Sequence, residues 1–103
     1  MVKINWTKEA EDRLTEIYNY ISKDKPDAAS KVVNEIYKKV QILKDFPEIG
    51  YKYEHTSGFH IRILLYGHYR IAYWIKSENR IDILGVFHGA LELKRHLKMG
   101  DIR

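Results

Sequence analysis

Apolar residues recur every three or four positions in the first half of the chain, and they alternate with polar residues over much of the second half. The helical spacing predicts one amphipathic helix over residues 8–22 and a second that has Pro26 and Asp27 in its first turn and is ended by Phe46-Pro47 and Gly50. Thr7 is a suitable N-cap for the first helix, and Asp24 for the second. Because neither helix can bury its apolar stripe alone, the two should form a hairpin against a shared surface.

The alternating pattern predicts that this surface is an antiparallel meander of three strands, over residues 61–65, 69–75 and 81–87. Residues 66–68 are Tyr-Gly-His, which is typical of a tight hairpin turn in which the glycine supplies a positive φ. Residues 76–79 are polar and form the second turn. The helical hairpin should therefore cover one face of an antiparallel sheet.

Three short segments complete the expected order. Residues 4–6 could form an edge strand, residues 51–54 a short strand within the loop over 48–58, and residues 90–99 a last helix. The predicted fold is one α+β domain over all 103 residues: an N-terminal strand and a helical hairpin packed on one face of an antiparallel sheet, then a short C-terminal helix. The other face of the sheet is left partly open, and we expect the functional surface there.

The positive charge of the chain lies in its second half. Residues 1–50 hold nine Lys or Arg and nine Asp or Glu, whereas residues 51–103 hold nine and five, together with all five histidines. The second half therefore supplies the whole net charge of +4, which suggests that an anionic partner meets it. The alternative is the ordinary basicity of a small protein.

Composition excludes several kinds of site. The chain has no cysteine, so it has neither disulfides nor thiolate metal sites. Its histidines show no HxH or HExxH spacing, and no phosphate loop, dinucleotide fingerprint or nucleophile elbow is present, so we expect no metal and no cofactor. No apolar run has the length of a signal peptide or a membrane span, which predicts a cytoplasmic protein that does not bind membranes.

Five side chains on or beside the strands carry most of the candidate chemistry. Arg70 offers a permanent charge with paired donors suited to phosphate or carboxylate, or else it pairs with an acidic side chain. His88 is a candidate general acid or base at the end of the last strand, or else it only closes that strand. Glu54, in the loop, is a candidate base or a solvated carboxylate. Tyr69 and Tyr73 are candidates for base stacking or for core packing.

The relative position of Arg62 and Arg70 depends on the hairpin loop between them. A two-residue turn places Arg70 opposite Leu65 or Ile63 and puts Arg62 on the other face, whereas a three-residue loop places the two arginines on one face. The sequence leaves both arrangements open. Further basic residues are Arg80, expected in a turn, and a C-terminal strip that docks a partner or is a solvated helix face. This strip comprises Lys94, Arg95, His96, Lys98 and Arg103.

Short motifs with a shared order extend over about 85 of the 103 residues. They are Trp6, Ala10, Leu14, Tyr20-Ile21, Pro26 with Ala28-Ala29, Leu43, Phe46-Pro47-Glu48-Ile49-Gly50, Tyr69-Arg70-Ile71-Ala72-Tyr73 and Val86-Phe87-His88-Gly89-Ala90. In this order they resemble the toxins of the RelE/ParE superfamily, the toxic half of bacterial type II toxin–antitoxin pairs. The resemblance implies the same α+β fold and a cytoplasmic antitoxin, encoded beside this gene, that forms a hetero-oligomer with the toxin.

The resemblance implies two alternative activities. RelE-like members are ribosome-dependent mRNA endonucleases, in which attack of a 2′-hydroxyl on the adjacent phosphate needs a base, an acid and positive charge. Arg70 matches the strand arginine of those enzymes, His88 matches the near-C-terminal histidine of the YoeB-like branch, and Glu54 lies loosely near its catalytic glutamate. However, Gly89 stands where that branch has a tyrosine, and apolar residues replace the lysine-rich strand of RelE proper. These are Ile61, Ile63 and Leu64.

ParE-like members have a similar fold but inhibit DNA gyrase without doing chemistry themselves. The long helical hairpin and the His-Gly-Ala ending favour this branch, so we expect a gyrase inhibitor, with the mRNA endonuclease as the alternative. A third possibility is a non-toxic remnant that only binds its antitoxin. On the ParE-like interpretation the residues that contact the target are Arg62, Tyr69, Arg70, Arg80, His88, Lys94, Arg95 and Lys98.

Overall fold

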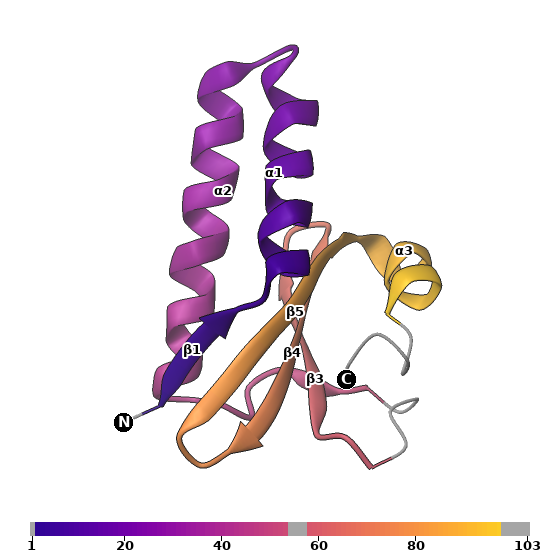
Figure 1. Cartoon of the computed structure of the whole chain (residues 1–103). Helices are drawn as coiled ribbons and strands as arrows, with labels where there is room; N and C mark the ends of the chain where they lie inside the picture. The colour runs from indigo at the N-terminus through magenta and orange to yellow at the C-terminus, as the bar shows by residue number, and fades with distance from the viewer. Residues whose placement is uncertain (1, 54–57, 98–103) are drawn as a thin grey trace.

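A helical hairpin packs against one face of a five-stranded sheet, and a short third helix packs against the other face (Figure 1). The computed structural model describes residues 2–53 and 58–97. The elements are β1 (Lys3–Trp6), α1 (Lys8–Ser22), α2 (Pro26–Gln41), a 3₁₀ turn (Ile42–Lys44), β2 (Tyr51–Lys52), β3 (Ile61–Tyr66), β4 (Tyr69–Ser77), β5 (Arg80–His88) and α3 (Gly89–His96). The predicted α+β class, element order and placement of the hairpin are confirmed.

The strands lie in the order β1-β5-β4-β3-β2. β3, β4 and β5 form the predicted antiparallel meander, and β2 adds to its edge beside β3. β1 is the opposite edge and runs parallel to β5, with Lys3 opposite Arg80 and Trp6 opposite Ile83. The sheet is therefore mixed. Parallel pairing is possible here because the helical hairpin and two strands of the meander lie between β1 and β5 in the chain.

The first helix begins and ends where its pattern predicts. The hydroxyl oxygen of Thr7 accepts a hydrogen bond from the N–H of Ala10 at 3.2 Å, as an N-cap does. The same hydroxyl donates to the carbonyl of Ile83 at 2.7 Å, so the cap also fixes α1 to β5. The prediction of Asp24 as the second N-cap is wrong. Lys25 holds that position, because Pro26 is the first helical residue and the N-cap precedes it.

The ends of several elements differ from the prediction. α2 ends at Gln41 and a 3₁₀ turn follows it, before the predicted end at Phe46-Pro47. β4 continues to Ser77, so the second turn is shorter than expected, and Arg80 is the first residue of β5 instead of part of a turn. α3 ends at His96, before the predicted end at residue 99. Leu97 has an extended backbone, and its side chain packs against the apolar core of the second sheet face. The strand predicted over residues 51–54 is described only to Lys52, and residue 54 lies outside the described residues.

The two faces of the sheet carry separate apolar cores. The larger core lies between the helical hairpin and the first face, and its buried residues include Ile36, Leu64, Ile71, Tyr73 and Ile83. The smaller core lies on the second face and comprises Ile63, Ala72, Phe87 and, from α3, Leu93. α3 therefore covers part of the face that we expected to be open.

Candidate functional site

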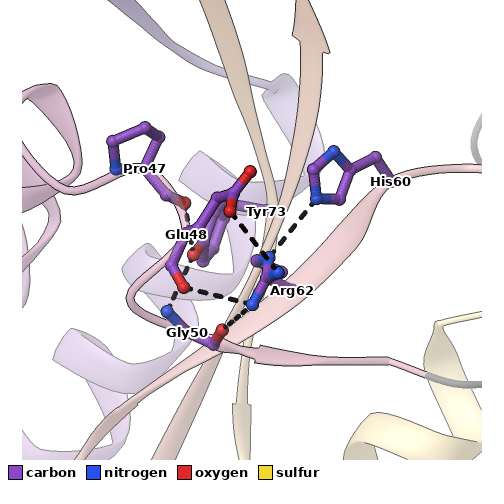
Figure 2. A network of polar contacts seen from close by, with 6 residues as sticks. All are labelled: Pro47, Glu48, Gly50, His60, Arg62 and Tyr73. Carbon is purple, nitrogen blue, oxygen red and sulfur yellow. Dashed lines mark hydrogen bonds and ion pairs between the residues drawn. The ribbon is translucent and has the colours of Figure 1, made fainter.

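Arg62 holds the loop that precedes β2 (Figure 2). Its Nη1 donates to the carbonyls of Glu48 at 3.1 Å and Gly50 at 2.6 Å, and its Nε donates to Nε2 of His60 at 3.3 Å. Its Nη2 lies 3.9 Å from a carboxylate oxygen of Glu48. Only 16% of the Arg62 side chain is exposed. Most of this guanidinium is directed at the loop of its own chain, and target binding by Arg62 stays a prediction.

Tyr73 lies directly opposite Arg62 on β4 and contacts the same loop. Its hydroxyl donates to the carbonyl of Pro47 at 2.7 Å and accepts the N–H of Gly50 at 3.0 Å, and its ring is fully buried. Burial raises the pKa of Tyr73, although the Gly50 N–H and the charge of Arg62 act in the opposite direction. Of the two roles predicted for this tyrosine, the structure supports core packing.

The two arginines lie on opposite faces of the sheet. A two-residue turn, Gly67-His68, joins β3 to β4, and Gly67 has the predicted positive φ of 56°. In this register Arg70 lies opposite Leu65, whereas Arg62 lies opposite Tyr73. Because side chains alternate along a strand, Arg62 faces the helical hairpin and Arg70 faces the other side. The first of the two arrangements left open by the sequence is therefore correct.

Arg70 lies on the second face, beside exposed apolar side chains. Its Nη1 donates to the hydroxyl of Tyr51 at 2.9 Å, and Tyr51 comes from β2. Its Nε is buried and has no hydrogen-bond partner among the described residues. Leu65 and Tyr51 are 48% and 44% exposed. Among the described residues, no carboxylate forms an ion pair with Arg70.

His88 is the exposed last residue of β5 and lies on the first face, opposite Tyr69. The two rings are nearly perpendicular, with centroids 5.4 Å apart, and the ring of His68 is 6.0 Å from that of His88. The N–H of Gly89 donates to the carbonyl of His68 at 3.0 Å, and Gly89 has a φ of 85°. That positive φ suits glycine and strains a bulky side chain.

A groove of about 500 Å³ separates this histidine from the C-terminal half of α1. Its apolar lining includes Ile17, Ile21 and Val86, and Tyr20 at its border is 79% exposed. Burial, together with the nearby hydroxyls of Tyr20 and Tyr66, raises the pKa of Tyr69, which also lines the groove. A large exposed aromatic side chain beside an apolar groove is typical of a protein-binding surface.

Arg70 and His88 do not meet at one site. Arg70 is opposite Phe87 in the β4–β5 pairing, and His88 is opposite Tyr69, so neighbouring strands direct the two functional candidates to opposite faces. A single phosphate bound on either face would thus be near only one of them.

Arg80 belongs to a polar cluster that the sequence analysis missed. Its Nε donates to Oδ1 of Asp82 at 3.0 Å, Nδ2 of Asn5 donates to the same oxygen at 3.2 Å, and Nζ of Lys76 lies 3.3 Å from Oδ2. Burial alone raises the pKa of Asp82, but these three partners outweigh it, and the pKa lies below its ordinary value. Asp82 is 5% exposed. The available signal was a lone carboxylate within the apolar strand Ile81–Phe87.

The basic C-terminal strip is solvent-exposed where the structure describes it. Lys94 and Arg95 are exposed on α3, and His96 lies 3.9 Å from a carboxylate oxygen of Glu92. Two predicted site residues, Lys98 and Glu54, lie outside the described residues.

The described residues contain neither a candidate metal site nor a membrane-spanning helix. Over residues 2–53 and 58–97, no three side chains of the metal-binding types are grouped so that they could hold an ion. In the same two segments, no helix has the length and apolar character needed to cross a membrane.

Comparison with known proteins identifies relatives of one kind. Residues 4–92 match the family described as the ParE toxin of the type II toxin–antitoxin system parDE. A putative toxin, Y4kP, of Sinorhizobium fredii is 48% identical over 48 residues, which are 47% of this chain and 50% of that protein. The match thus spans about half the length of the curated relative.

A solved structure shares the fold. The chain matches a structure described as the chromosomal ParDE system from P. aeruginosa with a TM-score of 0.72 and 23% identity. The match covers 87% of this chain and 98% of the other. The family match covers most of the chain and agrees with the resemblance to ParE-like toxins, which the long helical hairpin and the His-Gly-Ala segment favoured. This chain therefore belongs to the family of ParE toxins of type II toxin–antitoxin systems.

Proposed function

We propose that this ParE-type toxin arrests bacterial growth by binding DNA gyrase, and that an antitoxin neutralises it by binding to it. The observation that carries the choice of target is the separation of Arg70 and His88 on opposite faces of the sheet. An mRNA endonuclease of the alternative branch needs acid–base groups and positive charge around one phosphate. A toxin that inhibits by binding has no such requirement.

A second observation also favours binding over catalysis. Gly89 occupies the position at which the YoeB-like nucleases have a tyrosine, and its φ of 85° disfavours any bulky side chain. Arg62, the other arginine of the strands, is engaged by the carbonyls of Glu48 and Gly50. Among the described residues, Arg62, Arg70 and His88 are thus not placed together around one phosphate, and Gly89 adds no side chain to such a site.

The proposed target-binding surface combines the exposed basic residues with the end of β5. Lys94 and Arg95 lie on α3, which begins directly after His88, so their charges are on the segment of chain that follows the end of β5. A basic surface of this kind attracts an acidic region of a partner and increases the rate of association. Tyr69, opposite His88, contributes an aromatic contact beside it.

Growth after induction tests toxicity itself. We expect expression of the chain alone to reduce colony counts, and co-expression of the antitoxin encoded beside its gene to restore them. Because on this proposal Arg70 and His88 contact the target and perform no chemistry, the Arg70→Ala and His88→Ala variants should lose toxicity in part, through weaker binding, and not completely, as the loss of a catalytic group would require. Unchanged growth with a soluble, folded protein would instead identify a non-toxic remnant.

A further inference from the structure

The imidazole of His60 faces the guanidinium of Arg62 (Figure 2). Nε of Arg62 donates to Nε2 of His60 at 3.3 Å, and both residues are partly buried. The backbone of His60 is fixed as well, because its carbonyl accepts the N–H of Ile75 at 3.0 Å. His60 is therefore held beside Arg62 just before β3 begins.

This hydrogen bond determines the protonation state of His60. A guanidinium has only donors, so the imidazole nitrogen that faces it must carry a lone pair. His60 is then neutral, and its proton is on Nδ1. A charged imidazole has a donor at both nitrogens and accepts no hydrogen bond. The bond to Arg62 and the charged form of His60 therefore exclude each other.

The other charged groups around His60 leave this conflict in place. Among the described residues, Glu48, Lys76 and Glu78 line the same cavity of about 510 Å³ as His60. The carboxylate of Glu48 is already 3.9 Å from Nη2 of Arg62, and Glu78 is exposed, so solvent screens its charge. Lys76 adds a further positive charge. A proton on His60 would thus place a second cation directly beside Arg62.

Arg62 connects His60 to the loop that precedes β2. Its Nη1 donates to the carbonyls of Glu48 at 3.1 Å and Gly50 at 2.6 Å. A guanidinium is planar and moves as one unit, so repulsion from a charged His60 would also weaken these two bonds. Tyr73 would still hold the other side of the loop through the N–H of Gly50. The expected result is a loosened loop on an otherwise intact sheet.

We propose that His60 and Arg62 form an acid-sensitive clasp, in which neutral His60 keeps the loop Glu48–Gly50 closed on β3 and protonation of His60 opens it. The clasp operates between about pH 8 and pH 5, the range in which an imidazole gains its charge. Opening is favoured as the pH falls, because only the open form binds the proton without losing a hydrogen bond. This inference is independent of the proposed function.

Amide exchange at two pH values tests the clasp. The N–H of Gly50 reports on the loop, because it donates to the Tyr73 hydroxyl at 3.0 Å. After division by the intrinsic exchange rate at each pH, the protection of this amide should fall about tenfold from about pH 7.5 to about pH 5. The protection of the Ile71 amide, in the central strand β4, should change by less than about twofold.

His60→Gln is the matched variant, because its amide oxygen accepts a hydrogen bond from Arg62 and does not titrate. In this variant the protection of the Gly50 amide should change by less than about twofold over the same pH range. His68→Gln, in the exposed turn at the other end of β3, should keep the wild-type response. Nitrogen NMR of the wild type at about pH 7.5 should show the His60 proton on Nδ1.

Each contrary result overturns the inference. Unchanged protection at Gly50 in the wild type, or an equal fall in His60→Gln, would show that His60 does not control the loop. A proton on Nε2 would exclude the bond from Arg62, and an equal fall at Ile71 would indicate unfolding of the whole domain. Circular dichroism confirms that His60→Gln is folded. If it is not, the wild-type comparison of Gly50 with Ile71 and the nitrogen spectra decide the question.

Discussion

Arg62 and Tyr73, directly opposite each other on β3 and β4, hold the same loop from two sides. Arg62 donates to the carbonyl of Gly50 at 2.6 Å, and Tyr73 accepts the N–H of the same residue at 3.0 Å. Both backbone groups of Gly50 are therefore satisfied by side chains of the meander. The connection from α2 to β2 is thus fixed to the sheet, although it contains only a 3₁₀ turn and no longer element.

Removing the Tyr73 hydroxyl should destabilise the fold. Tyr73→Phe leaves the N–H of Gly50 and the carbonyl of Pro47 without their partner in a buried site, which costs about 1–3 kcal/mol. For a domain of this size that corresponds to a fall in Tm of at least about 4 °C. Thermal unfolding followed by circular dichroism measures it. Tyr18→Phe, at an exposed position of α1, is the control and should melt like the wild type.

Gly50 should tolerate no side chain. A Cβ at this position would lie 2.6 Å from the carbonyl oxygen of Ile63 and 2.8 Å from the Tyr73 ring, so Gly50→Ala must displace β3 or the loop. We expect a loss of about 1–3 kcal/mol in the free energy of unfolding, as for other overpacked sites. Gly67→Asn is the matched control, because that turn is open and Asn tolerates its positive φ. Equal stability of the two variants in urea would contradict the close packing at Gly50.

Because of Asp82, the free energy of unfolding should decrease at acidic pH. The pKa of its folded-state carboxyl lies below the unfolded value of about 3.9, so its contribution is complete above that value and is lost as the pH falls through the folded-state pKa. Asp82→Asn should therefore flatten the dependence of unfolding free energy on pH below about 4, and it should cost about 1–2 kcal/mol at pH 7. Urea titrations at several pH values measure both effects. The exposed control Asp45→Asn should retain the wild-type slope.

The basic residues of α3 should affect target binding without affecting the fold. Lys94 and Arg95 are exposed, so the double variant Lys94→Gln/Arg95→Gln should have the Tm of the wild type. If the strip binds an acidic region of gyrase, the variant should inhibit gyrase about threefold to tenfold more weakly than the wild type at low salt. At high salt this difference should be smaller, because salt screens exposed charges. Lys38→Gln/Lys39→Gln on α2 is the matched control. Equal loss in both variants would indicate a general effect of net charge.

Most of the architecture could be predicted because each of its main elements has a strong pattern. The apolar stripe that contains Leu14 and Ile17 has the spacing of a helix. The alternation through Ile61 and Ile63 has the spacing of a strand. The parallel direction of β1 could not be predicted, because four residues carry no information about which strand they join. Likewise, the N-cap of α2 is set by Pro26, which is the first helical residue. The pattern alone could not identify it, because adjacent polar residues before Pro26 were competing candidates.

The candidate site was predicted less well, since it depends on register. Whether Arg70 meets Arg62 is decided by a single residue in the turn at Gly67, and a one-residue change reverses every side chain on the strand. The bond from Arg70 to Tyr51 joins residues 19 positions apart, and no local pattern predicts it. The chemistry of Arg62 suggests target binding, but its guanidinium contacts the loop carbonyls of Glu48 and Gly50.

The most direct test of the proposed target is a supercoiling assay with purified DNA gyrase, run beside primer extension on an mRNA that is being translated in a purified system. We predict that the wild-type protein inhibits supercoiling and leaves the mRNA intact, and that adding the antitoxin restores supercoiling. Unimpaired gyrase together with cuts at ribosomal A-site codons, absent in the Arg70→Ala and His88→Ala variants, would contradict the account and identify an mRNA endonuclease.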